Sequence, residues 1–97
     1  MKLLILWAVL ATATASGESK MMTWKIDGVE RKAIVFSPTA RSASGKAPLV
    51  FAFHGHGDSA DNFQGAGLEQ HWSQAIVVYA QGLPSLRDGL AGWQVES

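Results

Sequence analysis

Histidine, aspartate and serine side chains gather in one short stretch of this sequence, residues 54–59. His54, His56 and Asp58 stand two residues apart, a spacing at which side chains that follow a strand can converge on zinc. Ser59 adds a hydroxyl that can act as a nucleophile. Glycines alternate with the histidines, and glycine lets the backbone turn sharply and approach a substrate closely. The stretch therefore predicts zinc-assisted hydrolysis, attack by serine, or stabilisation of an oxyanion.

The zinc hypothesis has an incomplete ligand set. The spacing resembles the H-x-H-x-D-H motif of the metallo-β-lactamase family, but Ser59 stands where that motif ends in histidine. The remaining histidine, His71, falls on a predicted helix. Because zinc sites need further ligands and hydrogen-bonded supports for them, the favoured interpretation has no metal and no cofactor. A zinc hydrolase using His54, His56 and Asp58 stays open as an alternative.

The serine hypothesis concerns Gly57-Asp58-Ser59, which resembles the block that opens the GDSL esterases, where the serine is the nucleophile. In that family the block ends the first strand directly. Here a predicted hairpin comes earlier and the two histidines intervene, so the register differs. We therefore expect Ser59 or Asp58 to cap the start of a helix by accepting a backbone N–H.

The oxyanion hypothesis uses the backbone rather than the side chains. Acyl transfer places negative charge on the carbonyl oxygen, and N–H groups already held at that point stabilise it. In α/β-hydrolases one such donor comes from the loop after the third strand. The N–H of His56 is the candidate donor, with Gly55 and Gly57 supporting the turn. We expect His54 to orient the loop rather than act as a base, because in this fold the base follows the nucleophile.

The surrounding elements place this stretch at the edge of a sheet. Residues 49–53 and 75–79 are unbroken apolar runs, which are typical of parallel strands covered on both faces. Between them we expect a turn over residues 61–64 and a helix over 68–73, with Leu68 and Trp72 on its buried face. A strand, helix and strand in this order form a parallel crossover, whose ligand sites lie at the carboxyl ends of the strands.

The segments on either side are simpler. Residues 23–26 and 31–36 flank Asp27-Gly28, a pair favoured in two-residue hairpin turns. Residues 38–47, and those from Ala80 onward, are expected to be loops. Trp24 is assigned to packing. The strand over residues 49–53 needs a neighbour on each side, and only 75–79 is available, so the chain is expected to be the front part of a larger protein.

Read together, three segments resemble a known family. "APLVFAFHGHGDSADNF", "AIVVYAQGLP" and "GWQ" look like the opening of secreted α/β-hydrolase esterases, the polyhydroxybutyrate depolymerase-like and feruloyl esterase-like proteins. The resemblance runs from Met22 to Gln94. It implies an α/β fold made of the first four strands and first helix of the hydrolase sheet, an antiparallel hairpin followed by a parallel β-α-β unit. It places the third strand between the fourth and an absent fifth.

The resemblance also implies hydrolysis of a polyester, aryl or short acyl ester by a serine nucleophile, a histidine base and an acidic partner. No G-x-S-x-G elbow occurs in the sequence and no histidine follows His71. The triad is therefore expected beyond Ser97, in a missing C-terminal part of the same fold, with residues 16–97 ending before the nucleophile elbow. Trp93 is a candidate for lining an acyl or aryl pocket, or for packing. A non-catalytic exported binding module, complete at this length, is the alternative.

Residues 1–15 have the layout of a secretory signal peptide. Lys2 precedes an apolar run, and small residues at Ala13 and Ala15 offer a cleavage site near Ala15. The run is shorter than the roughly 20 residues that span a bilayer. We therefore expect a secreted protein, extracellular or periplasmic, without a membrane anchor after cleavage. Eight basic and eight acidic residues leave no basic surface for nucleic acid, and the absence of cysteine excludes disulfides.

Overall fold

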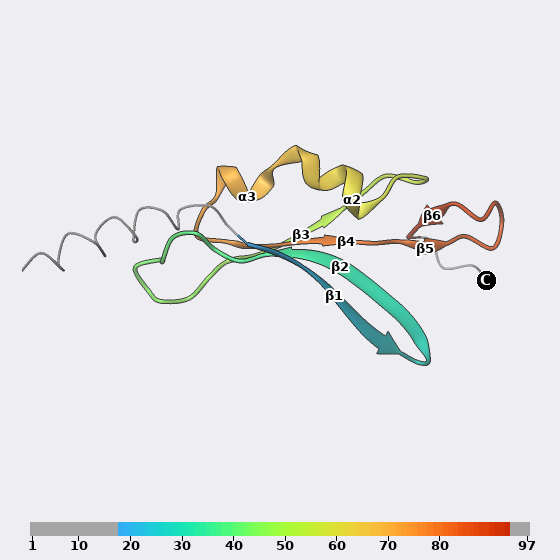
Figure 1. The fold of residues 1–97 in the computed structure, drawn as a ribbon, viewed down its shortest axis with the longest axis horizontal. Helices are drawn as coiled ribbons and strands as arrows, with labels where there is room; N and C mark the ends of the chain where they lie inside the picture. The colour runs from blue at the N-terminus through green and yellow to red at the C-terminus, as the bar shows by residue number, and fades with distance from the viewer. Residues whose placement is uncertain (1–17, 94–97) are drawn as a thin grey trace, which may run out of the picture.

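The computed structural model of this protein describes residues 18–93, which form a small mixed α/β domain. A four-stranded sheet in the order β1-β2-β4-β3 forms its base (Figure 1). The hairpin strands β1 and β2 are antiparallel, β2 and β4 are antiparallel, and β3 and β4 are parallel. The predicted combination of an antiparallel hairpin with a parallel strand pair is thus confirmed. The strands are β1 (Ser19–Ile26), β2 (Val29–Phe36), β3 (Leu49–Phe53) and β4 (Ile76–Ala80).

The hairpin turns at Asp27-Gly28, as predicted. Both residues have positive φ, 52° and 79°, which is the backbone of a two-residue turn that matches the twist of its strands. The paired strands are longer than predicted, since the ladder continues until Ser19 lies opposite Phe36. All of β1 is exposed, so its outer part carries no apolar alternation that would mark it as a strand.

The crossover between β3 and β4 consists of three short helical turns, α2 (Ala60–Phe63), the 3₁₀ turn η1 (Gln64–Ala66) and α3 (Leu68–His71). All three lie on one face of the sheet (Figure 1). The residues predicted as a turn therefore belong to helical turns instead. Gly67 interrupts the helix with a φ of 64°, a left-handed conformation suited to glycine.

The second part of the crossover ends earlier than predicted. Helix α3 stops at His71, so Trp72 lies beyond it, and its side chain is 48% exposed. Its predicted place beside Leu68 on a buried face was wrong, because the helix is too short to carry both residues. Trp24 is also exposed, at 43%, on the outermost strand, so its assignment to packing was wrong as well. Residues 38–47 form a loop, as predicted, whose Thr39 N–H donates to the carbonyl of Ser73 at 2.8 Å.

The core lies between the sheet and the helical turns, around Tyr79. Its ring meets Phe36 and Phe63 edge to face, each with a centroid distance of 5.8 Å. The Tyr79 hydroxyl donates to the Glu69 carboxylate at 2.8 Å and accepts the Leu68 N–H at 2.9 Å. Burial, followed by the bond to Glu69, raises the pKa of Tyr79 to about 12. The two hydrogen bonds of this hydroxyl hold α3 over β4.

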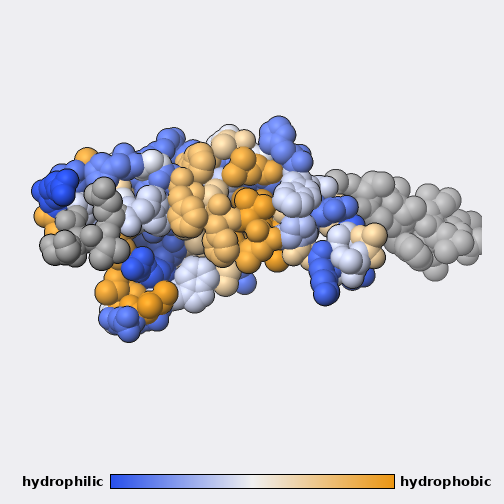
Figure 2. All heavy atoms as spheres, turned by 180° about the vertical axis from the view of Figure 1, so that it is seen from behind, coloured by the Kyte–Doolittle hydropathy of each residue, from blue (hydrophilic) through white to orange (hydrophobic). Residues whose placement is uncertain are grey.

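The opposite face of β3 is bare in the part of the chain that the structure describes. Val50 and Ala52 face the core, so Leu49, Phe51 and Phe53 point to the other side, where each is more than half exposed. Seen from behind, the molecule has hydrophobic residues gathered across its middle (Figure 2). Within residues 18–93, β3 pairs with β4 alone. The prediction that this strand is covered on both faces is therefore not met by the described residues.

A second, smaller hairpin follows β4, formed by β5 (Leu83–Pro84) and β6 (Ala91–Gly92). It was predicted as loop, since two-residue strands containing proline and glycine have no readable periodicity. Its base is tight: a Cβ on Gly82 would lie 2.6 Å from the carbonyl oxygen of Gly92. None of the helices within residues 18–93 has the length and apolar content that crossing a bilayer requires. The predicted signal peptide, 1–15, lies outside the described residues.

Candidate functional site

Residues 54–59 connect the carboxyl end of β3 to α2 and lie beside the β5-β6 hairpin (Figure 1). The Asp58 N–H closes a turn on the carbonyl of Gly55 at 3.0 Å. Gly57 has a φ of 81°, and its N–H donates to the carbonyl of Ala91 at 2.8 Å. Glycine at position 57 thus allows the loop to turn and to join the hairpin.

His54 is buried, with 2% of its surface exposed, and both of its ring nitrogens have partners. Nε2 accepts the backbone N–H of Gly82 at 3.0 Å. Nδ1 lies 2.7 Å from the carbonyl oxygen of Gly55, which can only accept, so Nδ1 is the donor of this bond. This side chain holds the loops after β3 and β4 together, and in this arrangement neither nitrogen is free to take a proton from a nucleophile.

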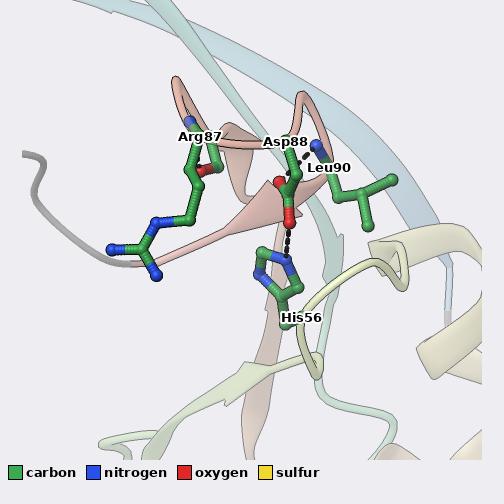
Figure 3. A network of polar contacts seen from close by, with 5 residues as sticks. His56, Arg87, Asp88 and Leu90 are labelled. Carbon is green, nitrogen blue, oxygen red and sulfur yellow. Dashed lines mark hydrogen bonds and ion pairs between the residues drawn. The ribbon is translucent and has the colours of Figure 1, made fainter.

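His56 projects differently, and its backbone and its side chain have separate surroundings. Its imidazole Nε2 lies 2.8 Å from the Asp88 carboxylate, which also accepts the Leu90 N–H at 3.0 Å (Figure 3). The bond to His56, followed by that to Leu90, lowers the pKa of Asp88. Among residues 18–93, no acceptor pairs with the backbone N–H of His56, which lies in an exposed loop.

Trp93 packs against the loop and also lines a pocket. Its indole N–H donates to the carbonyl of His54 at 2.7 Å, and its ring centroid lies 5.0 Å from that of Phe53. The ring is still 38% exposed and lines a pocket of about 320 Å³ together with His56 and the β5-β6 hairpin. One side of the ring therefore packs against the loop, while another faces the pocket.

Asp58 and Ser59 cap the first helical turn, as predicted. Ser59 Oγ accepts the N–H of Asn62 at 3.0 Å. The Asp58 carboxylate accepts the side-chain amide of Asn62 and the N–H of Ser59, both at 2.8 Å, and these bonds lower the pKa of Asp58. Their hydrogen bonds are those of a helix start rather than of a nucleophile and its base.

The zinc alternative gains no support from this arrangement. His54 uses both ring nitrogens for hydrogen bonds within the fold, and His56 directs Nε2 at Asp88 rather than at Asp58. In the described part of the chain, no three histidine, aspartate, glutamate or cysteine side chains come together as a metal-binding group.

Sequence reasoning missed the residues supplied by the second loop. Gln81 accepts the Ala60 N–H at 2.8 Å, Gly82 binds His54, and Asp88 binds His56. All three follow the carboxyl end of β4, the neighbour of β3 in the sheet. The rule that sites form at the carboxyl ends of adjacent parallel strands was the signal that could have drawn attention to them.

Comparison of the chain with known protein families, with curated proteins and with solved structures gave no match. Fold and site together define a mixed α/β domain with a histidine-rich loop at the carboxyl edge of its parallel strands.

Proposed function

We propose that this chain is the N-terminal part of a secreted serine carboxylic-ester hydrolase with an α/β-hydrolase fold, and that residues 54–57 form its oxyanion loop. The observation that carries the proposal is the N–H of His56, which belongs to an exposed residue after the carboxyl end of β3 and has no acceptor among the described residues. A backbone donor held in advance is what a developing oxyanion needs, since nothing has to reorganise as the charge appears.

In this mechanism a serine outside the described residues attacks the ester carbonyl carbon, and a histidine base takes the hydroxyl proton. The carbonyl π electrons move onto the oxygen, and the His56 N–H donates to the resulting oxyanion. When the carbonyl reforms, the alcohol leaves with the proton, and water then hydrolyses the acyl-enzyme by the same steps. His54 and Gly57 contribute by fixing the loop through their bonds to Gly82 and Ala91.

The bare flank of β3 supports the rest of the proposal. An apolar strand with an unpaired edge is a template for another strand, and a soluble protein normally covers it. A further strand from the C-terminal part of the same fold would pair with the free edge of β3, and the elements connected to it would cover the face that carries Leu49, Phe51 and Phe53, which are more than half exposed here. The signal-like residues 1–15 support export of the whole protein.

The decisive experiment separates the N–H of His56 from its imidazole. In the longer gene product that includes a G-x-S-x-G elbow, His56→Ala keeps the N–H and removes the ring, whereas His56→Pro removes both. Loss of an oxyanion donor lowers kcat by about 10²–10³, so His56→Pro should hydrolyse p-nitrophenyl acetate that much more slowly than His56→Ala. Circular dichroism of both variants controls for folding. Equal rates would contradict the oxyanion role.

The serine mechanism has its own test. Sequence downstream of the codon for Ser97 should encode the elbow, followed by an aspartate and a histidine, and a serine-directed phosphonate should abolish hydrolysis. Activity that survives the phosphonate would contradict a serine nucleophile.

A further inference from the structure

The pocket beside His56 is lined by a positively charged side chain, Arg87, that has no ion-pair partner in the described part of the chain. Arg87 and Asp88 are neighbours on the β5-β6 hairpin, and both line the pocket of about 320 Å³. The Asp88 carboxylate turns to His56, while the Arg87 guanidinium points elsewhere (Figure 3). Among residues 18–93, no aspartate or glutamate forms an ion pair with Arg87.

Both carboxylate oxygens of Asp88 already have partners. Its Oδ2 lies 2.8 Å from Nε2 of His56, and its Oδ1 accepts the Leu90 N–H at 3.0 Å. The backbone of Arg87 is fixed separately, since its N–H donates to Ser85 Oγ at 3.1 Å. Arg87 thus lines the pocket, while the carboxylate of its neighbour in the sequence is bound to His56. Guanidinium recognises carboxylate through paired N–H donors.

The other wall of the pocket is aromatic. Trp93 is anchored by its bond to the carbonyl of His54, and its exposed ring offers a flat apolar surface. A pocket of this volume is at the small end of the roughly 300–1,000 Å³ range of ligand sites, so it accommodates one arm of a substrate rather than a whole polymer. It adjoins His56, the proposed oxyanion donor.

We propose that Arg87 and Trp93 form a subsite for a substrate arm that combines a planar apolar group with a carboxylate, so that the preferred ester carries a free acid close to the scissile bond. This inference rests on the proposed function for its place in catalysis. Binding at the subsite is a property of the described residues and can be measured without hydrolysis.

The experiment is an NMR titration of the ¹⁵N-labelled full-length gene product at pH 7 with two probes of matched shape, 3-phenylpropionate and the neutral 3-phenylpropionamide. The acid should shift the indole N–H of Trp93 and the amide of His56, and should bind about fivefold more tightly than the amide, as befits a partly exposed ion pair. Added salt should reduce that preference. Trp93→Phe identifies the indole resonance.

Substitutions assign the preference to one residue. Arg87→Gln should reduce the acid-to-amide ratio to about one, and Arg87→Lys should retain part of it, because lysine keeps the charge without the fork. Arg31→Gln, an exposed arginine on β2, is the matched control and should keep the full ratio. Equal binding of the two probes, or an unchanged ratio in Arg87→Gln, would overturn the subsite. Esterase assays of the longer protein would fail independently if the proposed function were wrong.

Discussion

The ring of His54 accepts the backbone N–H of Gly82 at 3.0 Å and thereby joins the loops that follow two neighbouring parallel strands. The histidine is buried, and the same ring donates to Gly55. The loop that carries His56 thus owes its shape to a contact between residues 28 positions apart.

Replacing His54 by alanine should destabilise the fold. The change leaves the buried N–H of Gly82 without its acceptor, whereas the carbonyl of Gly55 keeps its bond from the Asp58 N–H. A buried unsatisfied group costs about 1–3 kcal/mol. Urea denaturation measures the loss in the free energy of unfolding. His71→Ala, at an exposed position, is the control and should be neutral. If His54→Ala were as stable as His71→Ala, the bond between His54 and Gly82 would not contribute to the stability of the fold.

Gly82→Ala should displace the small hairpin. A Cβ at this position meets the backbone of Gly92 at 2.6 Å, and backbone cannot move aside as a flexible side chain does. Overpacking of this kind costs about 1–3 kcal/mol. Gly65→Ala has open space around its Cβ and an ordinary φ, so it is the matched control. The comparison is made by thermal unfolding together with the indole N–H shift of Trp93, which should move in Gly82→Ala alone.

The hydroxyl of Tyr79 should make the protein sensitive to alkali. Its pKa is raised to about 12 in the folded state, against 10.0 for the ordinary phenol, so folding favours the protonated form. That stabilisation is complete below pH 10 and is lost as the pH rises from about 10 to about 12. The free energy of unfolding should therefore fall more steeply with pH between 9 and 12 for the parent than for Tyr79→Phe. Urea denaturation at a series of pH values measures it.

At neutral pH the same substitution should cost about 1–2 kcal/mol, since the Leu68 N–H and the Glu69 carboxylate lose their partner. Parallel pH profiles for the parent and Tyr79→Phe would show that the phenol does not titrate as described.

The hydrogen bond between His56 and Asp88 should be detectable in the titration of the Asp88 carboxyl group at acidic pH. The folded pKa of Asp88 is lowered, chiefly by the bond to His56, so the associated stabilisation is present above the ordinary aspartate range and is lost as the pH falls through the lowered pKa. An NMR titration of the Asp88 carboxyl carbon should show a midpoint below 3.8 that moves upward in His56→Ala. His71→Ala should leave it in place, and an unmoved midpoint in His56→Ala would contradict the pairing.

The uncovered flank of β3 should control the solution behaviour of residues 16–97. If these residues are part of a larger sheet, they should aggregate or fold only in part when expressed alone, and Phe51→Lys should improve solubility by placing a charge on the apolar edge strand. Thr23→Lys, on β1, is the control. A soluble monomer with a cooperative melt would instead favour the alternative of an exported binding module. Analytical ultracentrifugation and calorimetry distinguish the two.

Local signals made most of the main sheet predictable. Asp27-Gly28 determines its own turn, and the apolar runs of β3 and β4 mark strands without knowledge of their surroundings. The cap at Ser59 was predictable for the same reason, because its acceptor and donor lie three residues apart.

The remaining features depend on contacts between distant residues. The β5-β6 hairpin forms because Gly82 allows the backbone of Gly92 to come close, and the bond from His56 to Asp88 spans 32 positions. Neither has a pattern that a short window of sequence reveals. Trp72 was misplaced because α3 ends at His71, and the spacing of the apolar residues does not reveal that end.

The two borders of the main sheet are chemically unlike each other. The outer strand β1 carries Lys20 and Lys25, charged side chains of the kind that discourage another chain from annealing there. The border at β3 has no charge from Leu49 to Phe53. The sheet can therefore be extended at one edge only. A further strand can pair with β3, next to the histidine loop, whereas the lysines of β1 discourage pairing at the opposite edge.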